Sequence, residues 1–340
     1  MITMGWKANP EQYPPGLMLE QAVAAENAGF DCISMSDHFH PWSEAGPCSF
    51  PWTWLGAAAA VLKRMDMGTG VTCPILRYHP AIIAQAIATI DSMAHGRAYL
   101  GVGTGEALNE YSAMGSWPDY NERREMLRES MDLIRALLTG DEITFDGRYY
   151  HTRKARLFTP PKGPVDIYVS SLVPESAYFA GLYGDGLITV AGNSPEFYRQ
   201  MFANFDAGAL AAGRNPEQMP RQIEISVAYT DDVDAAVDLV KKYWAGTYIH
   251  AMHLQNIYTP GMSAMNGSVV GGDVIRKSRL ISADPEKHAA MAQEFIDLGF
   301  NRLMFGSAGP DEMKFIEAYG SEVLPRIRER NAQVLAVTPP

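Results

Sequence analysis

Segments that favour β-strands and segments that favour helices alternate along almost the whole of this 340-residue chain. Short apolar runs predict eight strands, at Ile2–Lys7, Cys32–Ser36, Met67–Val71, Ala98–Val102, Ile167–Val169, Gly186–Val190, Ile223–Val227 and Arg302–Phe305. Helix patterns follow them, most clearly at Pro15–Ala28, Trp52–Arg64, Pro80–Met93 and Arg123–Leu138, and a charged helix near Glu317–Arg330 closes the chain. Eight such units predict an α/β fold, a (β/α)8 TIM barrel that forms one domain over residues 1–340. A doubly wound open sheet has the same local pattern, but a count of eight favours closure.

Two segments interrupt this alternation, and we expect both to be insertions at loops of the barrel. Residues 142–154 carry Asp146-Gly147 between two strand-like runs, a pattern typical of a β-hairpin. Residues 246–277 form a long excursion that contains Gly, Met and Asn and precedes a helix expected to begin at Pro285.

The composition argues against several classes of protein. A net charge of −11 and the lack of any basic run argue against binding to nucleic acid or to anionic membrane surfaces. Apolar residues make up 47% of the chain, but Gly, Pro or charged residues break each apolar stretch before it reaches membrane-spanning length. No signal peptide is recognisable, and Cys32, Cys48 and Cys73 have no paired spacing. We therefore expect a cytoplasmic protein with reduced thiols.

The segment Ser36–Trp42 concentrates reactive side chains directly after the second predicted strand. It holds an acid, Asp37, two imidazoles, His38 and His40, and the indole of Trp42. Ligands of α/β proteins bind where strands give way to loops, and imidazole is well suited to moving a proton near neutral pH. The segment therefore predicts either a proton-transfer site or a metal site.

The metal alternative rests on the spacing of His38 and His40, which matches the H-x-H pattern of metal hydrolases on this fold. Such a site needs further ligands at later strand ends. Those positions carry no histidine and no carboxylate; they are Ser170, Ser171, Thr189, Val190 and Ala228. We therefore expect no metal.

Glycines mark the ends of two further strands. Gly101–Glu110 begins with three alternating glycines, which let the backbone approach a flat or phosphorylated ligand, and Glu106 projects from the same turn. The spacing is not that of a dinucleotide-binding fingerprint. Gly70 at the end of the third strand suggests a bulge or a close backbone approach. For each strand end the alternative is a purely structural turn, with Glu106 as a loop-capping carboxylate.

Four motifs, two of them described above, together resemble the coenzyme F420-dependent dehydrogenases of the luciferase-like superfamily. They are Ser36–Trp42, Arg77–Ala81, Gly101–Glu110 and Gly184–Gly186. The resemblance covers nearly the whole chain and implies a (β/α)8 barrel, coenzyme F420 as the cofactor, a small-molecule substrate, a cytoplasmic location and a homodimer.

The resemblance also implies roles for individual residues. His38 is similar to the family's active-site histidine, Trp42 to the aromatic residue beside the deazaflavin ring, and Glu106 to the catalytic glutamate. The implied cofactor contacts are Asp37, Gly70, Val71, Cys73, Thr104, Gly105 and Asn109, with a cis peptide between Gly70 and Val71. Where the family has a glycine-rich contact after the fifth strand, this chain departs from the pattern with Leu172, Val173, Glu175 and Ser176.

The implied substrate pocket distinguishes this chain from the sugar-phosphate members of the family. Glu11 and His40 line the pocket, and the family's phosphate-binding threonine, lysines and arginine are replaced by Val190, Asn193, Leu254 and Ser278. A phosphate would be left poorly paired there, unless Arg276, Lys277 or Arg279 points inward. We therefore expect a substrate without phosphate, namely a secondary alcohol or ketone or a sugar-like alcohol.

The mechanism that we expect moves one hydride and one proton. His38 accepts the hydroxyl proton as hydride leaves the carbinol carbon, Asp37 orients the loop, Trp42 shields the site, and Glu106 serves the proton at the reduced ring. The alternatives are a reductase acting on nitroaromatic, imine or enone acceptors, an FMN-dependent monooxygenase, and a non-catalytic deazaflavin carrier.

Overall fold

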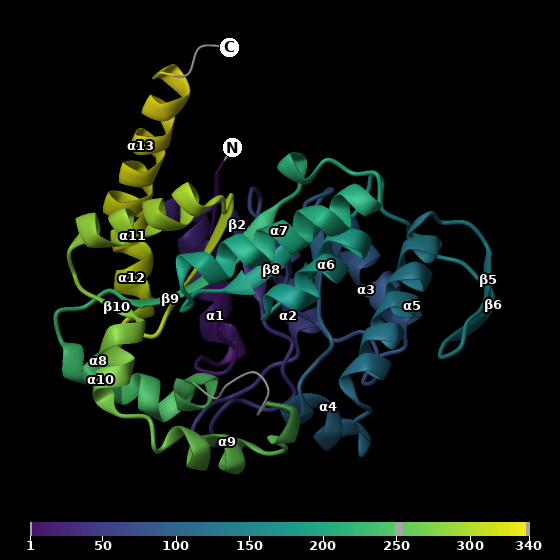
Figure 1. Cartoon of the computed structure of the whole chain (residues 1–340), viewed down its shortest axis with the longest axis horizontal. Coiled ribbons are helices and arrows are strands. Elements are labelled where there is room, and N and C mark those ends of the chain that lie inside the picture. Colours follow the sequence, from purple (N-terminus) through teal and green to yellow (C-terminus); the bar gives the residue numbers. More distant parts are fainter. Residues whose placement is uncertain (1, 249–253, 338–340) are drawn as a thin grey trace.

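A closed barrel of eight parallel strands forms the centre of the protein (Figure 1). The computed structural model describes residues 2–248 and 254–337. The barrel strands are β1 (Thr3–Ala8), β2 (Cys32–Met35), β3 (Asp66–Thr69), β4 (Ala98–Val102), β7 (Ile167–Ser170), β8 (Gly186–Val190), β9 (Arg221–Ala228) and β11 (Arg302–Ser307). Each pairs with its neighbour in that order, and β11 pairs with β1. The predicted barrel is therefore confirmed.

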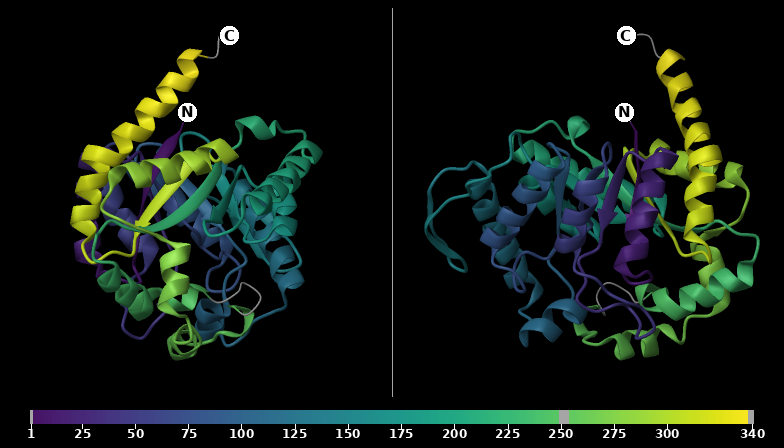
Figure 2. Two further views of the ribbon diagram at one scale, coloured as in Figure 1. Left: turned by 60° about the vertical axis from the view of Figure 1, so that its left-hand side comes forward. Right: turned by 180° about the vertical axis from the view of Figure 1, so that it is seen from behind.

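Helices pack around the outside of the barrel, as both views of Figure 2 show. They are α1 (Pro15–Ala28), α2 (Pro51–Val61), α3 (Pro80–Met93), α4 (Ala107–Met114), α5 (Tyr120–Leu138), α6 (Pro174–Tyr183), α7 (Pro195–Ala211), α8 (Val233–Leu239), α11 (Pro285–Leu298), α12 (Glu312–Ala318) and α13 (Leu324–Val337). Among the described residues, no helix is long and apolar enough to cross a membrane.

The helix ends follow local signals in the sequence. α1 and α3 each begin at a proline, which suits a first turn because the N–H groups there have no acceptor within the helix. α1 is capped at its end by Gly29, with φ of 92°. α5 begins three residues before the predicted start at Arg123, because the Asp119 side chain caps it by accepting the backbone N–H of Glu122 at 3.0 Å. The predicted closing helix is two helices, α12 and α13, joined by a π-helical turn. α13 extends beyond the barrel (Figures 1 and 2).

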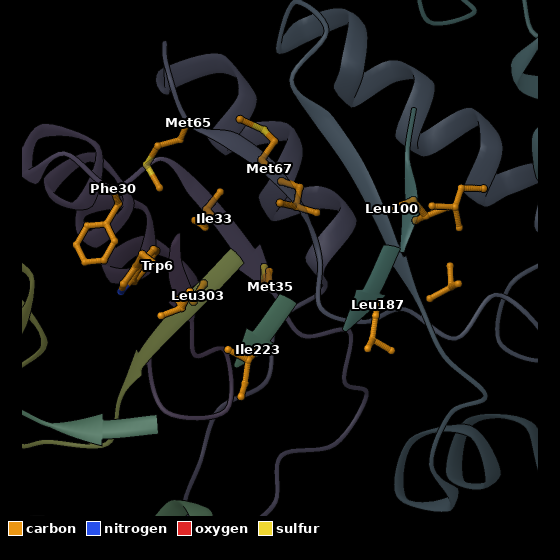
Figure 3. Close-up of a cluster of buried hydrophobic side chains, with 14 of the residues drawn as sticks. Trp6, Phe30, Ile33, Met35, Met65, Met67, Leu100, Leu187, Ile223 and Leu303 are labelled. Carbon is orange, nitrogen blue, oxygen red and sulfur yellow. The ribbon is translucent and has the colours of Figure 1, made fainter. Parts of the chain in front are cut away.

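Buried apolar side chains fill the layer between the strands and the helices (Figure 3). All four residues of β2 are buried, as expected of a parallel strand that is covered on both faces. The cluster joins side chains from strands far apart in sequence, including Trp6, Ile33, Leu100, Leu187 and Leu303. This core fixes the strands, so the loops at their carboxyl ends start from a rigid base.

The two segments predicted as insertions have different structures. β5 (Ile143–Asp146) and β6 (His151–Ala155) form an antiparallel hairpin, as predicted, and it projects from the side of the barrel (Figure 1). The second segment folds into short helices at Ala245–Tyr248, Leu254–Asn256, α9 (Pro260–Gly267) and α10 (Gly272–Ser278). Its residues 249–253 lie outside the described part of the chain. β10 (Leu280–Ile281) then pairs with β9.

Candidate active site

A cavity of about 980 Å³ lies at the carboxyl ends of the barrel strands, where this fold places its binding sites. It is lined by residues from the loops after most of the strands and by part of the second insertion. The predicted site residues that line it are Glu11, Asp37, His38, Trp42, Gly70, Val71, Cys73, Thr104, Gly105, Glu106, Asn109, Leu172, Val173, Ser176, Val190, Asn193 and Ser278.

Two of the predicted site residues do not line the cavity, and the side chain of a third lies outside the described part of the chain. His40 does not line it: its Nδ1 lies 3.2 Å from the carbonyl oxygen of Leu108, so the ring is turned toward α4. Glu175 is exposed in the first turn of α6 and also lies outside the lining. The roles expected of them, a pocket position for His40 and a cofactor contact for Glu175, stay predictions. Leu254 begins a short helix of the insertion, and its side chain lies outside the described part of the chain.

His38 lies between two carboxylates in this cavity. Its Nδ1 is 3.2 Å from the carbonyl oxygen of His40 and 3.6 Å from Oε1 of Glu11, and its Nε2 is 3.7 Å from Oε2 of Glu106. A carbonyl oxygen only accepts, so a neutral His38 in this hydrogen bond carries its proton on Nδ1. Nε2 is then an acceptor that faces the cavity beside Glu106.

Trp42 and Glu11 complete the surroundings of this imidazole. The rings of Trp42 and His38 have centroids 5.3 Å apart and are inclined by 56°. The side chain of Glu11 is 1% exposed, and its Oε2 has no hydrogen-bond partner among the described residues. Burial of a carboxylate oxygen without a hydrogen-bond partner costs free energy. The Glu11 carboxylate can therefore accept from a ligand that enters the cavity, or form an ion pair with His38 when that ring is protonated.

Glu106 stands at the position before α4 where a side chain would cap the helix, but it makes no such capping bond. Its carboxylate instead lies beside His38 and accepts from Nδ2 of Asn109 at 3.3 Å. Its removal from bulk water raises the pKa of Glu106 above the usual range, and the neighbouring His38 opposes that shift. The alternative of a loop-capping carboxylate is therefore not supported.

Asp37 is held behind His38 by a network of buried donors. Its carboxylate accepts from the Tyr78 hydroxyl at 2.9 Å, from Arg77 at 3.2 Å and from the hydroxyl of Thr72. Arg77 also pairs with Glu110 at 2.8 Å. Burial acts to lower the pKa of Arg77, but the two carboxylates outweigh it and raise the pKa overall. These bonds fix the loop that carries His38.

Part of the cavity wall is made of backbone rather than of side chains. The peptide between Gly70 and Val71 is cis, as the resemblance implied, and its carbonyl accepts from the ammonium group of Lys7. A Cβ atom at Gly70 would collide with Ser34, and one at Gly103 would lie 2.9 Å from Val71. Gly105 has φ of 77°, which a residue with a side chain rarely adopts. At these three positions neighbouring atoms leave no room for a side chain, so main-chain atoms form this part of the wall.

Comparison with known proteins identifies the family of this chain. The family described as luciferase-like monooxygenase matches residues 4–302. The chain belongs to this luciferase-like family. It is 37% identical over 332 residues to the F420-dependent glucose-6-phosphate dehydrogenase of Mycolicibacterium gilvum, covering 96% of this chain and 98% of the relative.

Solved structures give the same family and fold. An F420-dependent secondary alcohol dehydrogenase in complex with an F420-acetone adduct is 35% identical, with a TM-score of 0.91, and the match covers 96% of this chain and 99% of that one. The coenzyme F420-dependent tetrahydromethanopterin reductase of Methanopyrus kandleri shares the fold, at 23% identity and a TM-score of 0.79 over 96% and 99% of the two chains.

In this luciferase-like chain, several cavity residues escaped the sequence analysis. Lys7 and Glu224 form an ion pair of 2.8 Å in the cavity, and Arg124 also lines it. Nothing in the sequence around these three residues marks them, because only closure of the barrel brings their elements to one place. Of the three cations considered near Ser278, Arg279 lines the cavity. Among the described residues, no group of three or more His, Cys, Asp or Glu side chains is placed to hold a metal ion.

Proposed function

We propose that this chain is an F420-dependent oxidoreductase that transfers a hydride between a small organic substrate and the deazaflavin. The observation that carries this proposal is the placement of His38, with one ring nitrogen held by a carbonyl and the other facing a cavity with a backbone wall. The similarity to an F420-dependent secondary alcohol dehydrogenase and to F420-dependent glucose-6-phosphate dehydrogenases supports it.

The residues present fit a deazaflavin. Gly70, Gly103 and Gly105 place main-chain atoms on the cavity wall, where a flat ring can lie against them, and Cys73 packs beside Gly105. Arg124 lines the same cavity, and among the described residues it has no carboxylate within ion-pair distance. We assign it to the anionic tail of F420, beside Ser176 at the start of α6.

When bound, the deazaflavin supplies a ring carbon that accepts or donates a hydride. The chain's own groups then manage the proton. Nε2 of His38 accepts the proton of the substrate hydroxyl, and Glu11 beside Nδ1 stabilises the imidazolium that results. Asp37 and its network hold the loop in place, and Trp42 forms a wall of the site. Glu106, whose pKa is raised by desolvation, holds the proton that is exchanged at the ring.

We expect the substrate to lack phosphate. Val190, Asn193 and Ser278 line the cavity and carry no positive charge. A phosphate dianion needs several cationic donors when it leaves water. This favours a secondary alcohol or ketone, or a sugar-like alcohol, with the same groups serving the reverse reduction of a carbonyl, imine, enone or nitro acceptor.

A titration and a substrate screen test the proposal. Trp42 and Trp244 line the cavity, so quenching of tryptophan fluorescence should report a ligand that binds there. We expect this titration to show tighter binding of F420 than of FMN. Alcohols with oxidised F420, and carbonyl or nitro compounds with reduced F420, then give the direction. Binding of FMN in preference to F420 would reject the proposal in favour of a flavin monooxygenase.

We also propose that the chain works as a homodimer in the cytoplasm. The family resemblance supports the dimer, and the free thiols of Cys32, Cys48 and Cys73 support a reducing compartment. Light scattering on the purified protein tests the dimer, and a monomer mass would refute it.

A further inference from the structure

Arg279 lies on the substrate side of the cavity, and the described residues that it bonds are all neutral. Its Nε donates to the Tyr248 hydroxyl at 2.9 Å, one terminal nitrogen donates to the Ser226 hydroxyl, and the other lies 3.4 Å from the hydroxyl of Thr247. All four residues line the cavity together with Ser278. The guanidinium is therefore fixed in position at the cavity wall.

No negative charge balances this guanidinium. Among the described residues, no carboxylate lies within 4.0 Å of Arg279, and the five residues 249–253 next to Tyr248 include no Asp or Glu in the sequence. The hydroxyl of Tyr248 is itself 2.9 Å from Ser278 Oγ, which donates to the carbonyl oxygen of Ile275, so the chain of hydrogen bonds ends on neutral groups as well.

Other cations nearby are arranged differently. Lys7, on the floor of the same cavity, is paired with Glu224 at 2.8 Å. Arg276, one turn before Arg279, points away from the cavity and pairs with Asp234 at 2.7 Å and Asp273 at 3.1 Å. Arg279 is thus a half-buried cation that lines the cavity and has no carboxylate partner within the described parts of the chain.

The number of donors left on Arg279 indicates which anion fits. A guanidinium has five N–H groups, and three of these are directed at the hydroxyls of Tyr248, Ser226 and Thr247. One N–H remains on each terminal nitrogen, and two donors are the number that the two oxygens of a carboxylate can accept from a guanidinium. A phosphate dianion would find a single cation here, because Asn193 and Ser278 carry no charge.

From this geometry we propose that Arg279 binds a carboxylate of the substrate, so that the substrate class is a secondary hydroxy acid or the corresponding keto acid. The inference rests on the proposed function and names the substrate of that same cavity. Arg279 is a specificity-determining residue in this assignment, while His38 and Glu106 act at the carbinol end.

The test compares secondary hydroxy acids of increasing chain length, from lactate to 6-hydroxyheptanoate, with their methyl esters. A charge-assisted hydrogen-bonded pair should give the wild-type protein roughly a 10- to 100-fold preference in kcat/KM for the best acid over its ester. In Arg279→Gln this preference should fall to near equality, with the loss mainly in KM. In Arg276→Gln, the matched control on the outer surface, it should persist.

Two further measurements keep the outcomes separate. F420 affinity and thermal unfolding of Arg279→Gln should equal those of the wild type, which shows that the variant folds. Calorimetric titration of the best hydroxy acid into protein without cofactor measures carboxylate binding by itself, so Arg279 is tested even if F420 fails to bind and the proposed function is wrong. Three results would overturn the proposal. The wild type could use acids and esters equally well, or Arg279→Gln could keep the preference for acids. The third is an Arg279-dependent preference for glucose 6-phosphate over every hydroxy acid.

Discussion

The two sides of the cavity handle electric charge in opposite ways. On the side built by the loops after β2, β3 and β4, Asp37 and Glu110 share Arg77, and every one of these charges has a partner within 3.2 Å. On the side built by β9 and the second insertion, Arg279 donates to hydroxyl groups, and it has no carboxylate partner among residues 2–248 and 254–337. Charges that are paired with each other hold a loop in position but do not bind a ligand, whereas an unpaired charge can bind an oppositely charged ligand. The first side therefore positions the loop that carries His38, and the second side can select the substrate.

The largest effect is expected from His38, the group on the first side that faces the cavity. His38→Ala should lower kcat for hydride transfer by roughly 10²- to 10⁴-fold, because proton transfer by a positioned side chain contributes about that much. F420 affinity by fluorescence titration should change little. His151→Ala, on the exposed hairpin, is the control, and turnover equal to wild type in His38→Ala would reject the assigned role.

Removal of Arg77, the cation shared by Asp37 and Glu110, should destabilise the folded protein. Arg77→Met leaves Asp37 and Glu110 buried without their cation, and should lower the free energy of unfolding by about 3–5 kcal/mol. Arg128→Met removes only exposed ion pairs with Glu125 and Asp132, and should cost less than about 1 kcal/mol. Urea denaturation of both variants measures the difference. Similar losses of unfolding free energy in the two variants would show that the buried ion pairs of Arg77 contribute no more to stability than exposed ion pairs do.

A third carboxyl, Glu312, sharpens the comparison because it is buried without any cation. It accepts from Nε1 of Trp6 at 2.8 Å, and burial raises its pKa to about 8 despite that bond. The folded protein therefore binds this proton more tightly than the unfolded chain, and the stability that Glu312 contributes falls as the pH rises from about 4.5 to about 8.

Glu312→Gln should flatten this pH dependence. Unfolding free energies measured by urea denaturation across that range should fall less steeply with rising pH in the variant than in the wild type. Glu317→Gln, an exposed change on the same helix, should leave the slope unaltered. Equal slopes for wild type and Glu312→Gln would contradict the raised pKa.

The smallest effect is expected at Arg124, the other cavity cation without a carboxylate partner among the described residues. Arg124→Gln should weaken F420 binding by roughly 3- to 10-fold, since one charge-assisted hydrogen bond is lost at a partly exposed site. Binding of the deazaflavin fragment that lacks the phosphate and glutamate tail should not change. An equal loss for the fragment would place Arg124 at the ring instead.

The sequence was sufficient to predict the barrel because its signals are local. Each strand is a short apolar run covered on both faces, and prolines and glycines mark the helix ends, so α1 and α3 have the predicted bounds. The start of α5 was missed because it depends on capping by Asp119. The first side of the cavity was also predictable, because its loops directly follow strands.

The second side could not be predicted in this way. Arg276, Lys277 and Arg279 are close together in the sequence, and only the end of α10 at Ser278 decides that Arg279 faces the cavity while Arg276 faces outward. His40 shows the same limit: two residues after His38 in a loop, no fixed period determines which way its ring points. Roles for the remaining site residues stay predictions that the experiments above address.

The glycine wall has a consequence for how such a protein can change. Positions 70, 103 and 105 are glycines in the cavity wall, and a point substitution at any of them adds an atom that collides with a neighbour. The remaining lining surface includes exposed or half-buried side chains such as Val190, Asn193 and Arg279. A scaffold of this kind conserves its redox partner while its substrate range diverges, and laboratory evolution aimed at new substrates should find its useful variants on that surface.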